Sequence, residues 1–195
     1  MNSMSRRYQD ECRKDYRREE RKEREEREER KEKCPTIVKC GCPSSTSIGA
    51  VTAGTNITVA SLTLDTSCLC DPSIKLEFAS NIIAPAGIGT IDINFQVFKQ
   101  CRNQFTPVPV GPAWNYTLAN GPFNTTFSFF VCDSDSCDKD CCTYTVVATV
   151  VDPPAAGTSI SINNATLGAI ATCRSNECEK DCRRKCHRKC HCDCD

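Results

Sequence analysis

The segment IDINFQV, residues 91–97, decides the fold of this chain. Its apolar and polar side chains alternate without interruption, which is typical of a half-buried β-strand. The apolar members are Ile91, Ile93, Phe95 and Val97. The segment therefore predicts a strand with one face in a core and the other face in water.

The same period of two continues in both directions from this segment, from residue 44 to about residue 172. Four more alternating sets lie at residues 74–78, 114–118, 123–131 and 144–150. Shorter apolar runs lie at residues 57–64, 159–162 and 165–172. Residues typical of turns separate these runs at 71–72, 85–87, 107–112, 120–122 and 153–157. Because the links are short, about eight strands predict one all-β, antiparallel sandwich of jelly-roll type.

Composition narrows the possible functions. The 195 residues include 25 Lys and Arg, 25 Asp and Glu, and 18 Cys. The balanced charge gives no sign of a nucleic-acid partner. No apolar run reaches about eighteen residues, so we expect no membrane span. The first residues contain no apolar core of a secretory signal peptide, so synthesis in the cytoplasm is expected.

The cysteine content conflicts with that expectation. Cysteine at about nine per cent is typical of disulfide or metal scaffolds, yet disulfides rarely persist in a reducing compartment. Either the thiols hold metal, or the protein meets an oxidant later. Lysis of the producing cell at the end of bacterial sporulation is one such route.

A ten-residue connector, CPTIVKCGCP at 34–43, precedes the β-rich region of residues 44–172. Its short apolar centre lies between Pro35 and Pro43, which favours an edge strand or an arm. Its three thiols are Cys34, Cys40 and Cys42. We expect this connector to leave its own domain and to fasten to another copy of the chain.

Residues 1–33 form a charged arm before the connector. Positions 6–33 hold 13 Lys or Arg and 11 Asp or Glu, so the segment has almost nothing to bury. Glu residues stand four positions before Arg or Lys at several places, which favours a solvated helix. We predict a single helix, frayed at its start, that ends before Pro35.

The β-rich region contains an odd number of thiols, so at least one must pair outside the region or stay free. These are Cys68, Cys70, Cys101, Cys132, Cys137, Cys141 and Cys142. Cys68 and Cys70 stand two apart and would share one face of a strand. The loop 132–142 mixes four thiols with aspartates, but it lacks the Gly and Glu of a calcium-binding EF-hand loop. A solvated turn held by disulfides is the interpretation that we favour.

The tail, residues 173–195, is rich in Cys, His and basic residues. Its candidate metal ligands are Cys182, Cys186, His187, Cys190 and His191. Such clusters bind zinc or copper, but paired Cys-x-x-Cys knuckles are absent. Basic neighbours also make thiols reactive toward disulfides. Cross-linking, metal binding and a passive tail all remain open at this point.

No catalytic motif is present. The chain has no Gly-x-Ser-x-Gly, Walker or Gly-x-Gly-x-x-Gly pattern, and both histidines lie in the tail. We therefore expect no enzyme, no catalytic residue and no cofactor. The aromatic set Trp114, Tyr116 and Phe123 favours core packing, with a ligand-binding adhesin as the alternative.

Several blocks of sequence resemble an uncharacterised Cys-rich family of spore-forming clostridia across residues 34–173. They are CPTIVKCGCP, SLTLDTSCLCDPSIKLEF, FQVFKQCRNQFTPVPVGPAW, FSFFVCDSDSCDKDCCTYTVVATV and NNATLGAIATC. That family is similar in plan to the endospore appendage (Ena) proteins, which are jelly-roll subunits. In those proteins a Cys-bearing N-terminal connector reaches a neighbouring subunit, and disulfides lock a helical fibre. The long charged arm departs from that plan.

The resemblance implies two sets of thiols for disulfides between subunits. The connector would supply Cys34, Cys40 and Cys42. The receiving thiols would be Cys68, Cys70, Cys101, Cys132, Cys141 and Cys142. No pairing follows from the sequence.

Our functional prediction is a self-assembling structural protein of the spore surface, in an appendage fibre or coat. It would be made in the mother-cell cytoplasm without a signal peptide. Its partners would be further copies of itself, joined head to tail, and related subunits, with no nucleic acid or membrane. The alternatives are a zinc- or copper-binding Cys/His-rich protein and a β-sandwich adhesin.

Overall fold

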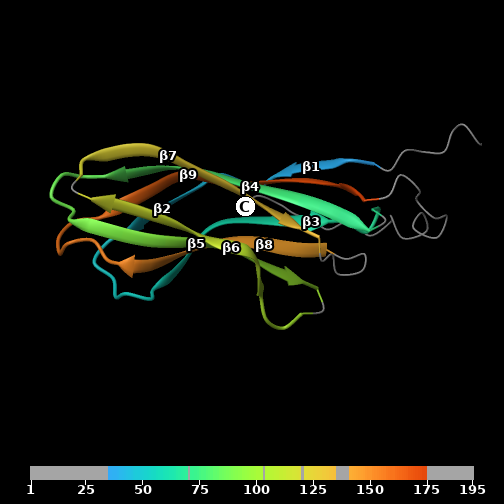
Figure 1. Cartoon of the computed structure of the whole chain (residues 1–195), viewed down its shortest axis with the longest axis horizontal. Helices are drawn as coiled ribbons and strands as arrows, with labels where there is room; N and C mark the ends of the chain where they lie inside the picture. Colours follow the sequence, from blue (N-terminus) through green and yellow to red (C-terminus); the bar gives the residue numbers. More distant parts are fainter. Residues whose placement is uncertain (1–34, 70, 103, 120, 135–140, 175–195) are drawn as a thin grey trace, which may run out of the picture. The chain divides into compact units, whose positions relative to one another are not determined.

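The computed structural model of the chain describes residues 35–69, 71–102, 104–119, 121–134 and 141–174. These residues form strands and turns and contain no helix (Figure 1). The strands are β1 (Ile37–Cys40), β2 (Ser44–Ile48), β3 (Asn56–Asp65), β4 (Pro72–Ala84), β5 (Thr90–Cys101), β6 (Val108–Ala119), β7 (Phe123–Asp133), β8 (Cys141–Asp152) and β9 (Ile160–Cys173). The helix predicted for the charged arm lies outside the described residues, as does the tail from residue 175.

Two antiparallel sheets face one another. Sheet A has the strand order β1-β9-β4-β7, and β2 also pairs with β9. Sheet B has the order β3-β8-β5-β6. β1 and β2 pair with successive stretches of the same edge of β9, so together they occupy one strand position. Each sheet therefore has four strand positions across its width. This order is that of a jelly roll, so the predicted fold class is confirmed.

The core lies between the sheets, on the faces that the period of two selects. All four apolar side chains of the segment 91–97 are completely buried. Phe95 of sheet B meets Phe78 of sheet A, with ring centroids 5.8 Å apart. Burial of each such side chain stabilises the fold by about 1.5–3 kcal/mol. The alternation in the sequence therefore becomes the packing that joins the two sheets.

Strand β6 begins inside the stretch 107–112, which the sequence predicts to be a turn. Val110 lies opposite Val97 of β5, and the register shifts just before Trp114. Gly111 has φ +68, a conformation that glycine adopts without strain. Proline is tolerated here because β6 is an edge strand, whose outer side has no strand partner that would need a backbone N–H group.

Strand β9 joins two runs that the sequence separates. Asn164 has φ +53, and the register against β4 shifts between Ala79 and Asn81. Asn tolerates the left-handed region better than most residues. The irregularity therefore bends one long strand at this point and does not end it.

The connector pairs with β9 of its own chain, from Ile37 opposite Ala171 to Cys40 opposite Gly168. Ile37 packs against the core, which explains why this strand stays on its own sheet. The expectation that the connector leaves its domain therefore differs from the structure of the single chain. The predicted character of the connector as an edge strand agrees with it.

Gly41, directly after β1, lies so close to the backbone of sheet B that a side chain would not fit. A Cβ atom at this position would lie 2.5 Å from the carbonyl oxygen of Ser61 in β3. The Gly41 amide donates to the carbonyl of Leu167 at 2.8 Å, so the backbone remains tied to β9. Residue 41 therefore needs glycine for space.

Candidate functional site: the edge thiols of sheet A

The described residues hold eight cysteines, and they fall into two classes. Six are in disulfide bonds: Cys42, Cys68, Cys101, Cys141, Cys142 and Cys173. Two are free and exposed, Cys40 and Cys132. The sequence nominates most of these residues as intermolecular thiols without separating the two classes. The register of the strands separates them.

Cys101 and Cys142 form a disulfide with each other inside sheet B. They are directly opposite on β5 and β8, with Cα atoms 4.0 Å apart, and both are buried. The sequence predicts an intermolecular disulfide for each of these two residues, but in the structure they bond to each other within the chain. They do so because the register of β5 and β8 places the two sulfur atoms side by side.

Three more intermolecular candidates, Cys42, Cys68 and Cys141, are also disulfide-bonded in the structure. Cys68 lies in the turn after β3 and so does not present the strand face that its spacing to Cys70 suggests. Cys34, Cys70 and Cys137 lie outside the described residues. The same is true of the metal candidates Cys182, Cys186, His187, Cys190 and His191.

The two free thiols lie at opposite ends of sheet A. Cys40 is the last residue of β1, and Cys132 is near the end of β7. These are the first and last strands in the order β1-β9-β4-β7. Each thiol therefore lies on a strand whose second edge has no strand partner among the described residues.

Both thiols lie on the outer face of sheet A, as the register shows. One row across the sheet runs Val38, Ile170, Lys75, Cys132. The next row on the same face, two residues along, runs Cys40, Gly168, Glu77, Phe130. Residues two apart on a strand share a face, so the thiols share a face although they stand in different rows.

Exposed apolar side chains surround the thiols on this face. Val38 is 69% exposed, Phe130 is 55% exposed and Ile170 is 45% exposed. Lys75 places its Nζ atom 5.3 Å from the centre of the Phe130 ring, and it forms an exposed ion pair with Glu77. A surface with apolar groups and few compensating charges is typical of a contact surface.

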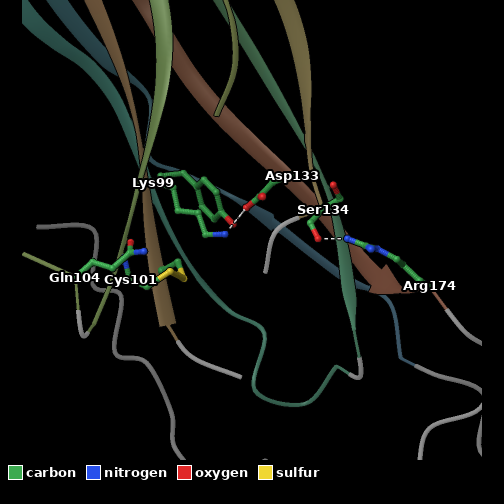
Figure 2. A network of polar contacts seen from close by, with 8 residues as sticks. Lys99, Cys101, Gln104, Asp133, Ser134 and Arg174 are labelled. Carbon is green, nitrogen blue, oxygen red and sulfur yellow. Dashed lines mark hydrogen bonds and ion pairs between the residues drawn. A yellow bond between two sulfur atoms is a disulfide. The ribbon is translucent and has the colours of Figure 1, made fainter. Parts of the chain in front are cut away.

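A buried polar cluster lies behind the end of β7, on the inner face. Figure 2 shows Lys99 and Asp133 pointing toward one another, and their Nζ and Oδ2 atoms are 2.7 Å apart. The hydroxyl of Tyr144 donates to the same Oδ2 atom at 2.7 Å. All three side chains are at most 5% exposed. A buried charge is tolerated only with such partners.

The sequence contained the signal for this cluster. Lys99 stands two residues after Val97, and Asp133 stands two residues after Val131, so the period of two places both side chains inside. One charge comes from sheet B and the other from sheet A. The ion pair therefore fixes β7 against β5, which sets the position of neighbouring Cys132.

Arg174 holds the same end of sheet A from the other side of β4. It donates to the backbone carbonyl of Ser134 (Figure 2), and its Nε atom lies 3.8 Å from Oδ1 of Asp71. Gln104 also closes the turn after β5, because its side chain accepts from the Cys101 amide at 3.1 Å. The segment next to Cys132 is therefore tied to Arg174, which directly follows β9.

Of the aromatic set considered as an adhesin site, Tyr116 and Phe123 are partly buried, whereas Trp114 is 37% exposed. Trp114 stacks on Phe129 with centroids 5.7 Å apart, and Tyr116 meets Phe127 at 5.0 Å. Tyr116 and Phe123 are partly buried against the core. These ring contacts pack β6 of sheet B against β7 of sheet A.

In the described part of the chain, no group of three His, Cys, Asp or Glu residues is placed to hold a metal ion. No helix in the same residues has the length and apolar character needed to cross a membrane.

The fold and the placement of its thiols define a disulfide-bearing jelly-roll domain whose described residues include two free thiols, at the edges of one sheet. The chain belongs to the family described as "Domain of unknown function (DUF4489)", whose model matches residues 34–172. The match includes the connector, so the family unit begins ten residues before the β-domain boundary predicted at residue 44. No curated protein matches the chain.

The solved structures to which the chain is similar include a viral protein and a xylan-binding domain. One is "Structure of infectious bursal disease virus Gt strain", with 14% identity, a TM-score of 0.46, and coverage of 69% of this chain and 33% of the viral chain. Another is the "CBM22-1 xylan-binding domain from Paenibacillus barcinonensis Xyn10C", with 11% identity, a TM-score of 0.34, and coverage of 69% and 82%. The chain thus spans about a third of the viral protein.

Proposed function

We propose that this protein is a self-assembling structural component of the spore surface, in an appendage fibre or a coat. Its subunits are joined through the edges of sheet A and by disulfides between copies. It is made in the mother cell and oxidised after release, and it carries out no enzymatic reaction.

One observation carries the proposal: two exposed free thiols mark the two edges of a sheet whose outer face is partly apolar. Unpaired edge strands are templates for pairing with another chain. Each of these two edges carries an exposed thiol. Disulfides between copies would make the assembly covalent.

The resemblance to the spore-forming family supports the location, and the disulfides support an oxidising end state. The sandwich itself offers no histidine as a general base for a Ser or Cys nucleophile. Its inner acidic residue, Asp133, is engaged by Lys99 and Tyr144. These features favour a structural role.

The test is to oxidise the purified full-length chain in air and to examine it with and without reductant. We expect a ladder of covalent oligomers on a non-reducing gel, and fibres or sheets in negative-stain electron microscopy. Reductant should collapse the ladder to one band. A single monomer band in the oxidised sample would overturn the proposed function.

A further inference from the structure

We propose that Cys40 of one copy forms a disulfide with Cys132 of the next copy, so that sheet A continues from molecule to molecule. The inference rests on the proposed function and makes it specific. It names one pair among the nine thiols that the sequence nominated.

The two thiols cannot bond to each other within one molecule. They lie on β1 and β7, with β9 and β4 between them. Neighbouring strands are about 4.8 Å apart, so three such steps separate the two strands. A disulfide requires Cα atoms within about 7 Å. Only a second molecule can bring these two thiols together.

The strand directions suit a joint between copies in the same orientation. Every pairing in sheet A is antiparallel, so β1 and β7, three places apart, run in opposite directions. When a second copy is placed beside the first, its β1 is antiparallel to the β7 of the first. Cys40 and Cys132 then face each other on the same side of the continued sheet.

The protein already contains this bond geometry. Cys101 and Cys142 are directly opposite on adjacent antiparallel strands, and they are bonded. In the proposed joint, Cys40 and Cys132 take the same relative positions across the boundary between two molecules. Within one molecule the residues opposite them are Gly168 and Lys75, which provide no sulfur.

The joint forms by oxidation. Each thiol loses its proton and one electron, a sulfur–sulfur bond replaces the two sulfur–hydrogen bonds, and dioxygen takes up both electrons and both protons as hydrogen peroxide. Both thiols are exposed, so oxidant reaches them in the separate molecules. A small soluble disulfide can replace dioxygen by exchange, and it leaves as two thiols.

The register predicts how successive copies are placed. Cys132 lies in the row of Val38, two residues from Cys40 along the strand. Each copy is therefore shifted by two residues, roughly 7 Å along the strands, relative to the one before. Because the contact joins different surfaces and sheets twist, the assembly grows as an open helix and does not close as a dimer.

The experiment uses two full-length variants, Cys40→Ser and Cys132→Ser, each purified reduced and then oxidised in air. Each variant alone should lose the covalent ladder of the parent chain. An equal mixture should give a covalent dimer and nothing longer, because each variant supplies the thiol that the other lacks. Mass spectrometry of the dimer should find the Cys40 peptide linked to the Cys132 peptide. Ser128→Ala, on the same strand and face as Cys132, is the matched control and should polymerise like the parent.

Three other outcomes overturn the pairing, and they are distinct from failure of the proposed function. A dimer from Cys132→Ser alone, in which one Cys40 peptide is linked to another Cys40 peptide, means that Cys40 pairs with Cys40. Ladders from both single variants mean that other thiols join the subunits. A mixture without the linked peptides also contradicts the pairing. In all three cases the parent chain still polymerises, whereas a parent chain that stays monomeric overturns the proposed function itself.

Discussion

Two pairs of cysteines in this protein differ in their bonding, and the register of the strands explains the difference. Cys101 and Cys142 are opposite each other inside sheet B, and they are bonded and buried. Cys40 and Cys132 are exposed at the two edges of sheet A and unbonded. The number of cysteines is therefore a poor guide to their roles. The role of each cysteine depends on whether the residue directly opposite it on the neighbouring strand is also a cysteine.

The surroundings of the two pairs differ as well. The buried pair lies near the ion pair of Lys99 and Asp133, in the part of the core where the two sheets are joined. The edge thiols lie among exposed side chains such as Val38 and Phe130. We therefore expect the interior group to determine stability and the edge group to determine assembly.

The largest effect should come from Asp133→Ala, which leaves the ammonium of Lys99 buried without its carboxylate. Removing one partner of a buried ion pair costs about 3–5 kcal/mol. Urea unfolding of the oxidised monomeric fraction measures it. The matched control is Glu77→Ala, which removes an exposed ion pair on the outer face of the same sheet and should cost less than about 1 kcal/mol.

Replacing both charges sharpens this result. The double variant Lys99→Met/Asp133→Leu removes the charges and retains apolar volume, so it should recover much of the stability that Asp133→Ala loses. Equal costs for Asp133→Ala and Glu77→Ala would show that the interior cluster does not hold the sheets together.

The second effect is the loss of the interior disulfide in Cys101→Ala/Cys142→Ala. The bond closes a loop with a sequence separation of 41 residues. Such a cross-link contributes about 2–4 kcal/mol, chiefly by restricting the unfolded chain. The urea midpoint of the oxidised double variant should fall relative to that of the oxidised parent. An unchanged midpoint would show that the interior disulfide does not stabilise the fold, and would contradict the proposed difference between the interior pair and the edge pair.

Tyr144→Phe should have a smaller effect. It removes the hydroxyl that donates to Asp133 and keeps the buried ring. A hydrogen bond to a charged group contributes about 1.5–3 kcal/mol, and the remaining contact with Lys99 should reduce the loss toward the lower value. Thermal unfolding of the variant provides the measurement, and a stability equal to that of the parent would argue against this hydrogen bond.

The smallest effect on stability should come from Cys40→Ser and Cys132→Ser. Both side chains are exposed and unbonded, so each change should alter the free energy of unfolding by less than about 0.5 kcal/mol. Urea unfolding under reducing conditions is suitable, because no polymer forms there. A loss as large as that of Cys101→Ala/Cys142→Ala would place these thiols among the stabilising groups.

Much of the sandwich could be predicted from the sequence, because the period of two is a local signal. The alternation at 91–97 identifies buried side chains correctly, and extending it by four residues places Lys99 and Cys101 inside as well. The Pro-rich start of β6 and the bend at Asn164 in β9 were missed, since local turn propensity there yields to pairing with the neighbouring strand.

The functional site was harder to predict because it depends on contacts between residues far apart in the chain. Cys40 and Cys101 look alike in sequence, each near the end of an apolar run. Only the strand order reveals that Cys101 meets Cys142 and that Cys40 meets Gly168. The sequence predicts that the connector leaves its domain, but pairing with β9 and the partial burial of Ile37 hold β1 in place.

The most direct test of the account is a disulfide map of polymer grown from an equal mixture of light- and heavy-nitrogen protein. A bond between molecules produces linked Cys40 and Cys132 peptides in which one peptide is light and the other is heavy. We predict these mixed pairs in abundance, together with uniformly labelled Cys101–Cys142 pairs from within each chain. Polymer in which Cys40 is not linked to Cys132, or is linked only between equally labelled peptides, would contradict the account.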